Sequence, residues 1–353
     1  MLSARNIVLG LCIIALACGA ERRSAFEAPK PEEPKEETPP LPGPIEPSAE
    51  AGSTTPACTD TPIKPAGSEA TIAAEYAPHY TAYELGAVPG VPGPLGGCAI
   101  DPNDPNRLLI AGESEQATAA IYAIKVKRGD CKHITGFDGT ATLVASAPNV
   151  DANLVFTAKG LLLYTRWPTV GFGELLPGAT SPSREIDLKA LGMAGGGAGG
   201  LGFVPPGLDA EGELRAVTWP EGVFHHLYTE PDGNLLHVGG AQPAQPEVKL
   251  EGGPGGFAYV PAGSPGFPEQ RLVVAEWDVN SVATYAVDQS GDPIASTRKA
   301  FFTSFPRPWG AYFEPLTGDF IFLTWGANGS FGADDRVYIV QGFTPPPPPP
   351  DPK

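Results

Sequence analysis

The chain has 353 residues with a formal net charge of −17, and it contains 42 prolines, 44 glycines and five cysteines. An acidic chain of this kind argues against binding to nucleic acid and against electrostatic docking on anionic lipid, since both of these carry negative charge. The prolines and glycines gather in the two ends of the chain and in turns, which disfavours long helices.

Residues 1–18 predict a lipoprotein signal peptide. Arg5 precedes an apolar run at 7–17 that is too short to span a membrane. The sequence Ala-Leu-Ala-Cys at 15–18 resembles the lipobox of bacterial lipoproteins, in which the residue matching Cys18 carries the lipid. The residue after it is Gly19 and not aspartate, so the resemblance implies anchoring to the outer membrane or the cell surface of the bacterial envelope. An ordinary signal peptide with an unrelated cysteine is the alternative.

Two further segments have the composition of unstructured chain. Residues 19–57 are rich in proline, glutamate and lysine and contain few bulky apolar side chains, which predicts a disordered tether. Residues 344–353 include six consecutive prolines and predict a disordered tail with polyproline II character. Such a tail is either a terminal spacer or a ligand for an aromatic groove. Residues 58–343 then form one folded domain.

A repeated pattern organises this domain. Short apolar stretches recur at 98–102, 154–158, 201–205, 257–261 and 311–315, and four of the five end in proline. Each is followed by a second apolar run, and successive copies start roughly 47 to 56 residues apart, near the period of a propeller blade. The repeat predicts an all-β fold, a β-propeller with five blades. A sixth, degenerate blade and a β-sandwich are the alternatives.

The last repeat is one strand short. Only residues 336–340 follow its second apolar run, whereas the strand-like residues 80–88 precede the first repeat. We expect these two segments to pair, with Tyr83 near Ile339, because an open sheet edge would otherwise remain.

The repeats resemble bacterial secreted β-propellers of the NHL, gluconolactonase and TolB-like group over residues 80–343. The gluconolactonase branch of that group holds a metal ion in the channel with acidic and asparagine side chains. Here Asp101, Asn153 and Glu314 fall at non-equivalent places in the repeat, so the resemblance transfers no catalytic residue and no metal ligand. No cofactor is expected; calcium in the loop with Asn328 and Asp335 is the one metal left open.

The cysteines predict one disulfide. Exported proteins fold in an oxidising compartment, and we expect Cys58 and Cys131 to pair at the rim of the fold. Cys98 occupies a repeat position that is otherwise apolar, which predicts a buried free thiol.

One face of the propeller carries the candidate ligand-binding residues. The second strands end in an aligned series, and the full set of candidates is Glu113, Arg166, Trp167, Trp219, Glu276, Trp277, Trp309 and Trp325. The tryptophans form an aromatic rim that can stack on sugar rings or hold apolar side chains, and the charged members act as polar anchors. Packing between blades is the favoured alternative for most of the tryptophans, and Trp309 is more open to a functional role because it breaks the repeat.

Two functions are compatible with this face. The first is a lipid-anchored, non-catalytic binding or scaffold module for a protein, a peptide or a glycan. The alternative is a hydrolase or lyase that acts on a sugar or lactone at the same face, with a carboxylate pair drawn from Glu113, Asp151, Glu276 and Asp278. His225 and His226 are adjacent in a strand and face opposite sides, so they cannot bind one metal together.

Overall fold

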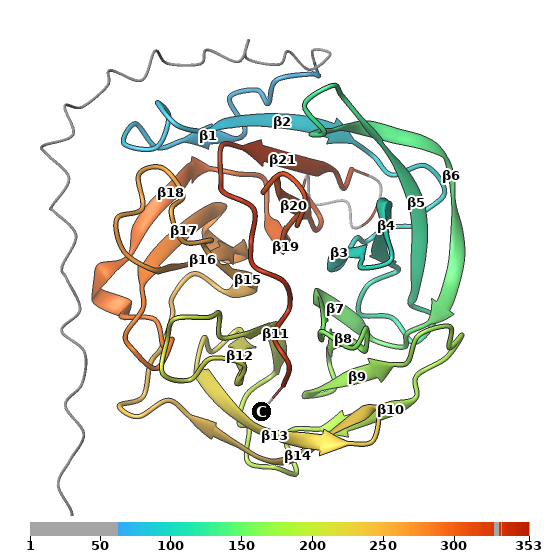
Figure 1. Ribbon diagram of the computed structural model, residues 1–353, viewed down its shortest axis with the longest axis vertical. Helices are drawn as coiled ribbons and strands as arrows, with labels where there is room; N and C mark the ends of the chain where they lie inside the picture. The colour runs from blue at the N-terminus through green and yellow to red at the C-terminus, as the bar shows by residue number, and fades with distance from the viewer. Residues whose placement is uncertain (1–62, 328–331, 333, 353) are drawn as a thin grey trace, which may run out of the picture. The chain divides into compact units, whose positions relative to one another are not determined.

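The computed structural model describes residues 63–327, 332 and 334–352, which form five antiparallel sheets arranged as the blades of a β-propeller (Figure 1). The predicted all-β fold with five blades is confirmed. The helical elements of the described residues are two short 3-10 turns, η1 (Trp277–Val279) and η2 (Ala295–Thr297). Within these residues, no helix has the length and apolar character that crossing a bilayer requires.

Each blade is built from consecutive strands, ordered from the centre outward. Blade 1 contains β3 (Cys98–Asp101), β4 (Asp104–Gly112), β5 (Ala120–Arg128) and β6 (Ile134–Ser146). Blade 2 contains β7 (Val150–Phe156), β8 (Leu162–Arg166), β9 (Gly171–Leu175) and β10 (Arg184–Asp187). Blade 3 contains β11 (Gly197–Phe203), β12 (Leu214–Trp219), β13 (Phe224–Asp232) and β14 (Leu235–Pro243).

The last two blades also use strands from the start of the described chain. Blade 4 contains β15 (Pro254–Tyr259), β16 (Arg271–Glu276), β17 (Ser281–Ala286) and β18 (Lys299–Ser304), with β1 (Thr71–Ile72) at its outer edge. Blade 5 contains β19 (Pro308–Phe313), β20 (Phe320–Thr324), β21 (Val337–Gln341) and β2 (Thr81–Gly86). In β2 and β21, Tyr83 pairs with Ile339, which confirms that an N-terminal strand closes the ring.

The inner strands approach one another so closely that glycine is required where they meet. A Cβ atom on Gly256 would lie 2.8 Å from the nitrogen of Ala311, and one on Gly310 would lie 2.5 Å from the carbonyl oxygen of Gly96. Real Cβ atoms do not approach backbone this closely, so a larger residue would push the inner strands apart. The glycine-rich loops therefore bring neighbouring strands together around the ring axis.

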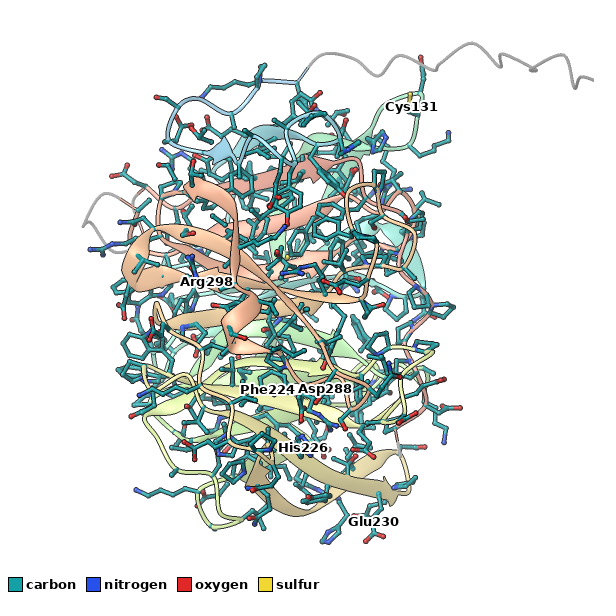
Figure 2. All side chains as sticks on the ribbon, turned by 90° about the vertical axis from the view of Figure 1, so that its left-hand side faces the viewer. Cys131, Phe224, His226, Glu230, Asp288 and Arg298 are labelled. Carbon is teal, nitrogen blue, oxygen red and sulfur yellow. The ribbon has the colours of Figure 1, made fainter. Side chains whose placement is uncertain are left out.

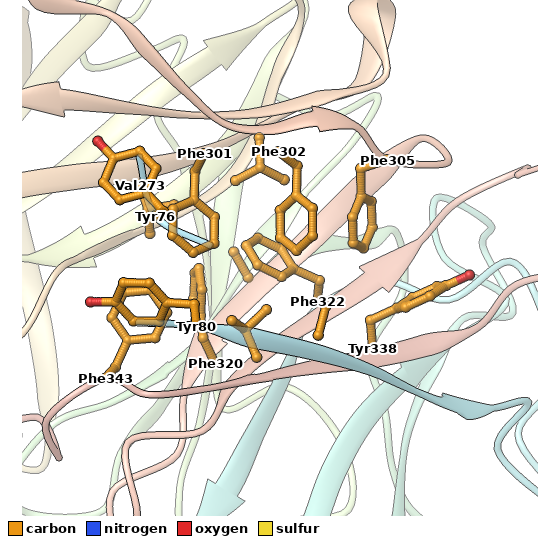
Figure 3. Packing of buried hydrophobic residues seen from close by; sticks show 14 of the residues in the cluster. Tyr76, Tyr80, Val273, Phe301, Phe302, Phe305, Phe320, Phe322, Tyr338 and Phe343 are labelled. Atoms are coloured by element: carbon orange, nitrogen blue, oxygen red, sulfur yellow. The ribbon is translucent and has the colours of Figure 1, made fainter. Parts of the chain in front are cut away.

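An aromatic core lies between blades 4 and 5 (Figure 3). Phe313 and Phe320 stack with ring centroids 4.0 Å apart, and Phe343 lies 4.3 Å from Tyr80. Burial of these rings stabilises the fold, because it removes apolar surface area from water and brings the rings into contact with one another. Because Phe343 is anchored here, the proline segment that follows starts from a fixed point.

One of the other sequence predictions is confirmed, and several concern residues outside those that the structure describes. Cys98 is buried and free, as expected. Cys131 lies in the turn between β5 and β6, but Cys58 falls outside the described residues, so the disulfide stays a prediction. The signal peptide with Cys18, and the tether at 19–57, also lie outside them. Residues 344–352 are described, and they follow the last strand as extended coil.

Candidate functional site

A bulge in β7 carries two polar side chains to the centre of the ring. Val150 pairs with Arg166 and Leu154 pairs with Tyr164, so β7 has two more residues than β8 over this interval. Such an irregularity bends a strand and redirects its side chains, and it is common next to functional sites. Asp151 and Asn153 lie in the extra segment, and both are buried.

Asn153 ties the inner strands of four blades together. Its side-chain oxygen accepts from the backbone nitrogens of Leu201 and Phe257, each at 3.2 Å, and its amide donates to the carbonyl oxygen of Ala311 at 3.3 Å. These bonds connect β7 with β11, β15 and β19. Asn153 therefore closes the middle of the ring and separates its two mouths.

Asp151 lies on one side of this closure and is fully buried. Its Oδ1 accepts a hydrogen bond from Trp309 Nε1 at 2.8 Å. Among the described residues, no N–H or hydroxyl group donates to its Oδ2. Burial raises the pKa of the Asp151 carboxyl well above its usual value, and the nearby Glu115 raises it further. Both effects favour the neutral, protonated form of Asp151.

Glu115 is the group that faces Asp151. Burial raises the pKa of the Glu115 carboxyl to about 7, and a side-chain hydrogen bond with Asp151 counteracts part of that rise. Two carboxyl groups in contact can form a hydrogen bond only when one of them carries a proton. One proton shared between the two carboxyl groups therefore accounts for both shifts: Asp151 favours its neutral form, and the pKa of Glu115 lies at about 7.

The loop that presents Glu115 is held in an uncommon backbone conformation. Glu113 has a φ of 52° and Glu115 a φ of 69°, a region that residues other than glycine seldom adopt. The Glu115 nitrogen and the Ser114 hydroxyl both donate to the carbonyl oxygen of Val150 at 2.9 Å, which fixes the loop against β7. Backbone outliers held in this way are concentrated at functional sites.

All five tryptophans form one contiguous cluster at the same mouth. Trp309 is its buried centre, with 2% exposure, and it lies 5.9 Å from both Trp219 and Trp325 and 6.2 Å from Trp277, measured between ring centroids. Trp167 adjoins Trp219 at 6.0 Å. The four outer rings are half-buried, so the cluster presents aromatic surface to solvent, and its central ring, Trp309, contacts Asp151.

A positive charge adjoins the cluster. The Arg307 guanidinium lies 4.5 Å from the centroid of the Trp277 ring, a cation–π contact. Trp277 Nε1 donates to the carbonyl oxygen of Trp325 at 2.9 Å, so the edge of this ring is fixed while Arg307 covers one of its two faces.

Two of the predicted anchors are engaged inside the blades. Glu276 is fully buried; it forms an ion pair with Arg298, located in Figure 2, and accepts the Tyr285 hydroxyl at 2.6 Å. Arg166 is nearly buried and forms an ion pair with Glu185 at 3.0 Å. Glu113 is half-buried, two residues before Glu115. A ligand contact by any of the eight predicted residues stays a prediction.

Sequence reasoning considered Asp151 as one member of a carboxylate pair but missed Glu115. The available signal was the break in the repeat at Glu113, where the other blades have tryptophan at the end of the second strand. The residues after that break, Ser114 and Glu115, form the loop that reaches back to β7.

His225 and His226 behave as expected for neighbours in a strand. His225 is buried, which lowers its pKa, whereas His226 Nε2 lies 2.7 Å from Asp292 Oδ2; Figure 2 locates His226. They do not face a common ligand.

No group of three or more histidine, cysteine, aspartate or glutamate side chains in the described part of the chain is arranged to hold a metal ion. Glu115 and Asp151 supply only two carboxyl groups. Asn328 lies outside the described residues, and Asp335 accepts from the backbone nitrogens of Leu95 and Gly326. We therefore derive no chemical step through a metal, and calcium in that loop stays a prediction.

Comparisons with known proteins give only distant likenesses. No protein-family model and no curated protein sequence matches the chain. Among solved structures, a putative glucose dehydrogenase from Thermus thermophilus is 17% identical, with 74% of this chain and 87% of that chain covered and a TM-score of 0.41. The soluble aldose sugar dehydrogenase of Escherichia coli is 15% identical, with 73% and 86% covered and a TM-score of 0.41. A putative 6-phosphogluconolactonase from Bacteroides uniformis is 12% identical, with 71% and 76% covered and a TM-score of 0.38.

These comparisons correct the first function expected from the sequence. A non-catalytic binding or scaffold module was the main expectation, but the three structures are described as sugar dehydrogenases and a lactonase, which contradicts it and agrees better with the alternative. The identities are 17% or lower and the TM-scores are 0.41 or lower, so the likeness itself assigns no activity to this chain.

Proposed function

We propose that the chain is a propeller hydrolase that opens a sugar lactone at the tryptophan-lined mouth, with Glu115 and Asp151 as its acid–base pair. The observation that carries this proposal is the buried Asp151, bonded to Trp309 at the centre of the tryptophan cluster, with the Glu115 carboxyl beside it and the pKa values of both carboxyl groups raised by burial. A general base is most effective when its pKa lies near the working pH, and about 7 for Glu115 meets that condition.

In the proposed reaction, Glu115 first accepts a proton and later donates it. The Glu115 carboxylate takes a proton from a water molecule whose oxygen attacks the lactone carbonyl carbon. A tetrahedral intermediate forms, its ring C–O bond breaks, and the leaving oxygen receives the proton from Glu115. Asp151 stays protonated and positions Glu115 through their hydrogen bond. Water is added and the carboxylic acid product is released.

The arrangement supports hydrolysis of a lactone over cleavage of a glycosidic bond. Glycosidases that use two carboxyl groups keep them about 5 to 9.5 Å apart, which leaves room for the sugar or for water between them. The Glu115 and Asp151 carboxyl groups are close enough for each to affect the pKa of the other directly, which does not fit the wider spacing of a glycosidase pair.

The tryptophan cluster supplies the surface for the sugar. The apolar faces of sugar rings stack on aromatic side chains, and the half-buried Trp277 and Trp325 present such faces close to Trp309. Arg307, stacked on Trp277, adds a positive charge suited to a carboxylate product.

The test is an assay of the purified protein against a panel of five- and six-membered sugar lactones, with pH-indicator detection of the acid released. Glu115→Gln should lower kcat/KM by about 100-fold or more, because general base catalysis contributes 10²- to 10⁴-fold. Glu251→Gln, an exposed glutamate in the loop that enters β15, is the matched control and should match the wild type. An inactive wild-type protein across the panel, or full activity in Glu115→Gln, would refute the proposal.

We also propose that the protein is a lipoprotein of the bacterial cell envelope, anchored to the outer membrane or cell surface through a lipid on Cys18. Support comes from the lipobox-like sequence at 15–18. Metabolic labelling with a fatty acid and detergent-phase partitioning should detect the anchor in the wild type and lose it in Cys18→Ser. Equal labelling of both proteins would contradict the anchor.

A disulfide between Cys58 and Cys131 is the last part of the proposal. An exported protein meets oxidising conditions, and the buried Cys98 is unavailable for pairing. Peptide mapping without reduction should recover 58 and 131 in one linked fragment; a linkage through Cys98 would contradict the assignment.

A further inference from the structure

A cavity lies at the other end of the inner strands. It has a volume of about 400 Å³ and its lining is predominantly apolar. Its floor includes Asn153, Leu201 and Phe257, and its wall includes Phe203 and Tyr312. Asp151 is the second residue of β7, whereas Asn153, Val155 and Phe156, the last of which ends the strand, line the cavity. The cavity therefore opens toward the end of β7 that is opposite to the carboxyl pair, and its farthest β7 residue, Phe156, lies roughly 17 Å along the strand from Asp151.

The proline segment forms the roof of this cavity. Pro346 to Pro350 all belong to its lining, and Figure 1 shows the C-terminal segment crossing in front of the inner strands. The segment is held at both ends: the Thr344 nitrogen donates to Ser264 Oγ at 3.2 Å, and the Ala158 nitrogen donates to the carbonyl oxygen of Pro350 at 3.3 Å.

Polyproline has the properties that such a roof needs. Proline has no N–H, so a run of it crosses an apolar opening without leaving donors unsatisfied. Its fixed φ makes the ordered segment inexpensive in conformational entropy. Six residues in polyproline II conformation extend about 19 Å, enough to bridge the mouth of a ring of inner strands.

The roof covers the cavity without filling it. The side chains of Asn153 and Tyr259, two polar residues of the lining, already form hydrogen bonds within the protein. Asn153 uses its side chain on three backbone groups, and the Tyr259 hydroxyl donates to the carbonyl oxygen of Gly291 at 2.8 Å. A charged or strongly hydrogen-bonding ligand would lose its hydration there without replacement.

We infer that this cavity is a second binding site, for a small, uncharged apolar molecule, and that Pro346 to Pro350 are its lid. The volume falls within the 300 to 1,000 Å³ that is usual for small-molecule sites. The inference is independent of the lactonase proposal, because the two sites share no side chain that contacts a ligand.

The test uses N-phenyl-1-naphthylamine, a neutral fluorescent probe, titrated into the full-length protein. The wild type should bind one equivalent saturably. Ala258→Trp and Val155→Trp each place a large ring in the cavity from a different strand, and each should weaken binding at least tenfold. Ala190→Trp, at an exposed position outside the cavity, is the matched control and should bind as the wild type does.

Two cavity variants are used because a single cavity-filling change can disturb the fold. Circular dichroism would reveal such a disturbance. Non-saturable binding by the wild type, or wild-type binding by both folded cavity variants, would overturn the site. Trp277→Ala should leave probe binding unchanged; loss of binding there would assign the probe to the tryptophan cluster and also overturn the inference.

The lid is tested by its effect on rates. Replacing Pro346 to Pro350 with glycine and serine should raise both the association and dissociation rates of the probe about tenfold, because a flexible segment covers the mouth for less of the time. Unchanged rates in stopped-flow measurements would show that the prolines are not a lid.

Discussion

Trp309 donates its indole N–H to Asp151 at 2.8 Å, a hydrogen bond that joins the inner strand of blade 5 to that of blade 2. One partner is the centre of the tryptophan cluster and the other is the buried member of the carboxyl pair. This single contact therefore couples the surface proposed to hold the sugar to the groups proposed to carry out the chemistry.

Asp151→Asn tests whether Asp151 works as a neutral positioning group. The asparagine amide can still accept from Trp309 and can donate to Glu115 in place of the carboxylic proton. We expect kcat/KM to stay within about tenfold of the wild type. Asp151→Ala removes both bonds and should cost at least 100-fold. Equal, large losses in both variants would instead assign Asp151 a proton-transfer role.

The pH–rate profile should report the titration of Glu115. Because the ionised form is the base and burial raises its pKa to about 7, kcat/KM should increase through neutral pH and level off above about pH 8. Asp151→Asn should retain this rising limb, since the base is unchanged. A profile that is flat between pH 5 and 8 would disagree with the assignment.

The same pKa predicts how stability depends on pH. The Glu115 carboxyl titrates at 4.5 in an unperturbed chain and at about 7 in the fold, so the folded state binds more protons between these values. The free energy of unfolding therefore falls as pH rises from 4.5 to 7, and the contribution of Asp151 has the same sign.

Glu115→Gln removes the part of this dependence that Glu115 contributes. Urea unfolding should show the variant about 2 kcal/mol more stable than the wild type at pH 8.5 and nearly equal to it at pH 4. Glu251→Gln should follow the wild type at both values. A variant less stable than the wild type at pH 8.5 would contradict the raised pKa.

Asn153→Ala should destabilise the ring. The change leaves the buried N–H groups of Leu201 and Phe257 without an acceptor, and each unsatisfied group costs about 1–3 kcal/mol. We expect a loss of about 2–4 kcal/mol in urea unfolding. Asn103→Ala, at an exposed turn, should change stability by less than about 0.5 kcal/mol.

Trp277→Ala separates packing from sugar binding. Loss of a half-buried indole should cost about 2–3 kcal/mol of stability, somewhat less than for a fully buried ring. If its face holds the substrate, KM should increase about tenfold with little change in kcat, because the ring does not touch the reacting bond. Trp277→Phe should restore most of the KM. A stability loss with unchanged KM would assign the residue to packing alone.

Much of the fold was predictable because a blade is a local pattern. Recurring short apolar stretches, proline at strand ends and the recurring tryptophan identified five blades. The missing outer strand of the last repeat identified the pairing of Tyr83 with Ile339. Cys98 was predicted correctly because its repeat position is apolar in the other blades.

The candidate site was only partly predictable. The aligned second strands placed the tryptophans at one mouth, but Glu276 and Arg166 occupy equivalent repeat positions and are paired inside their blades. Repeat position indicates which end of a blade a residue occupies. It does not indicate which ionic partner lies beside it.

The sequence by itself determined the blade count, the ring closure and the side of the ring on which the tryptophans lie, because each depends on order along the chain. Only the tertiary structure decided that Glu115 meets Asp151 and that the terminal prolines cover a cavity. Both are contacts between segments distant in sequence, brought together by a strand bulge and by close packing of glycine-rich inner strands, and neither leaves a periodic trace in the chain.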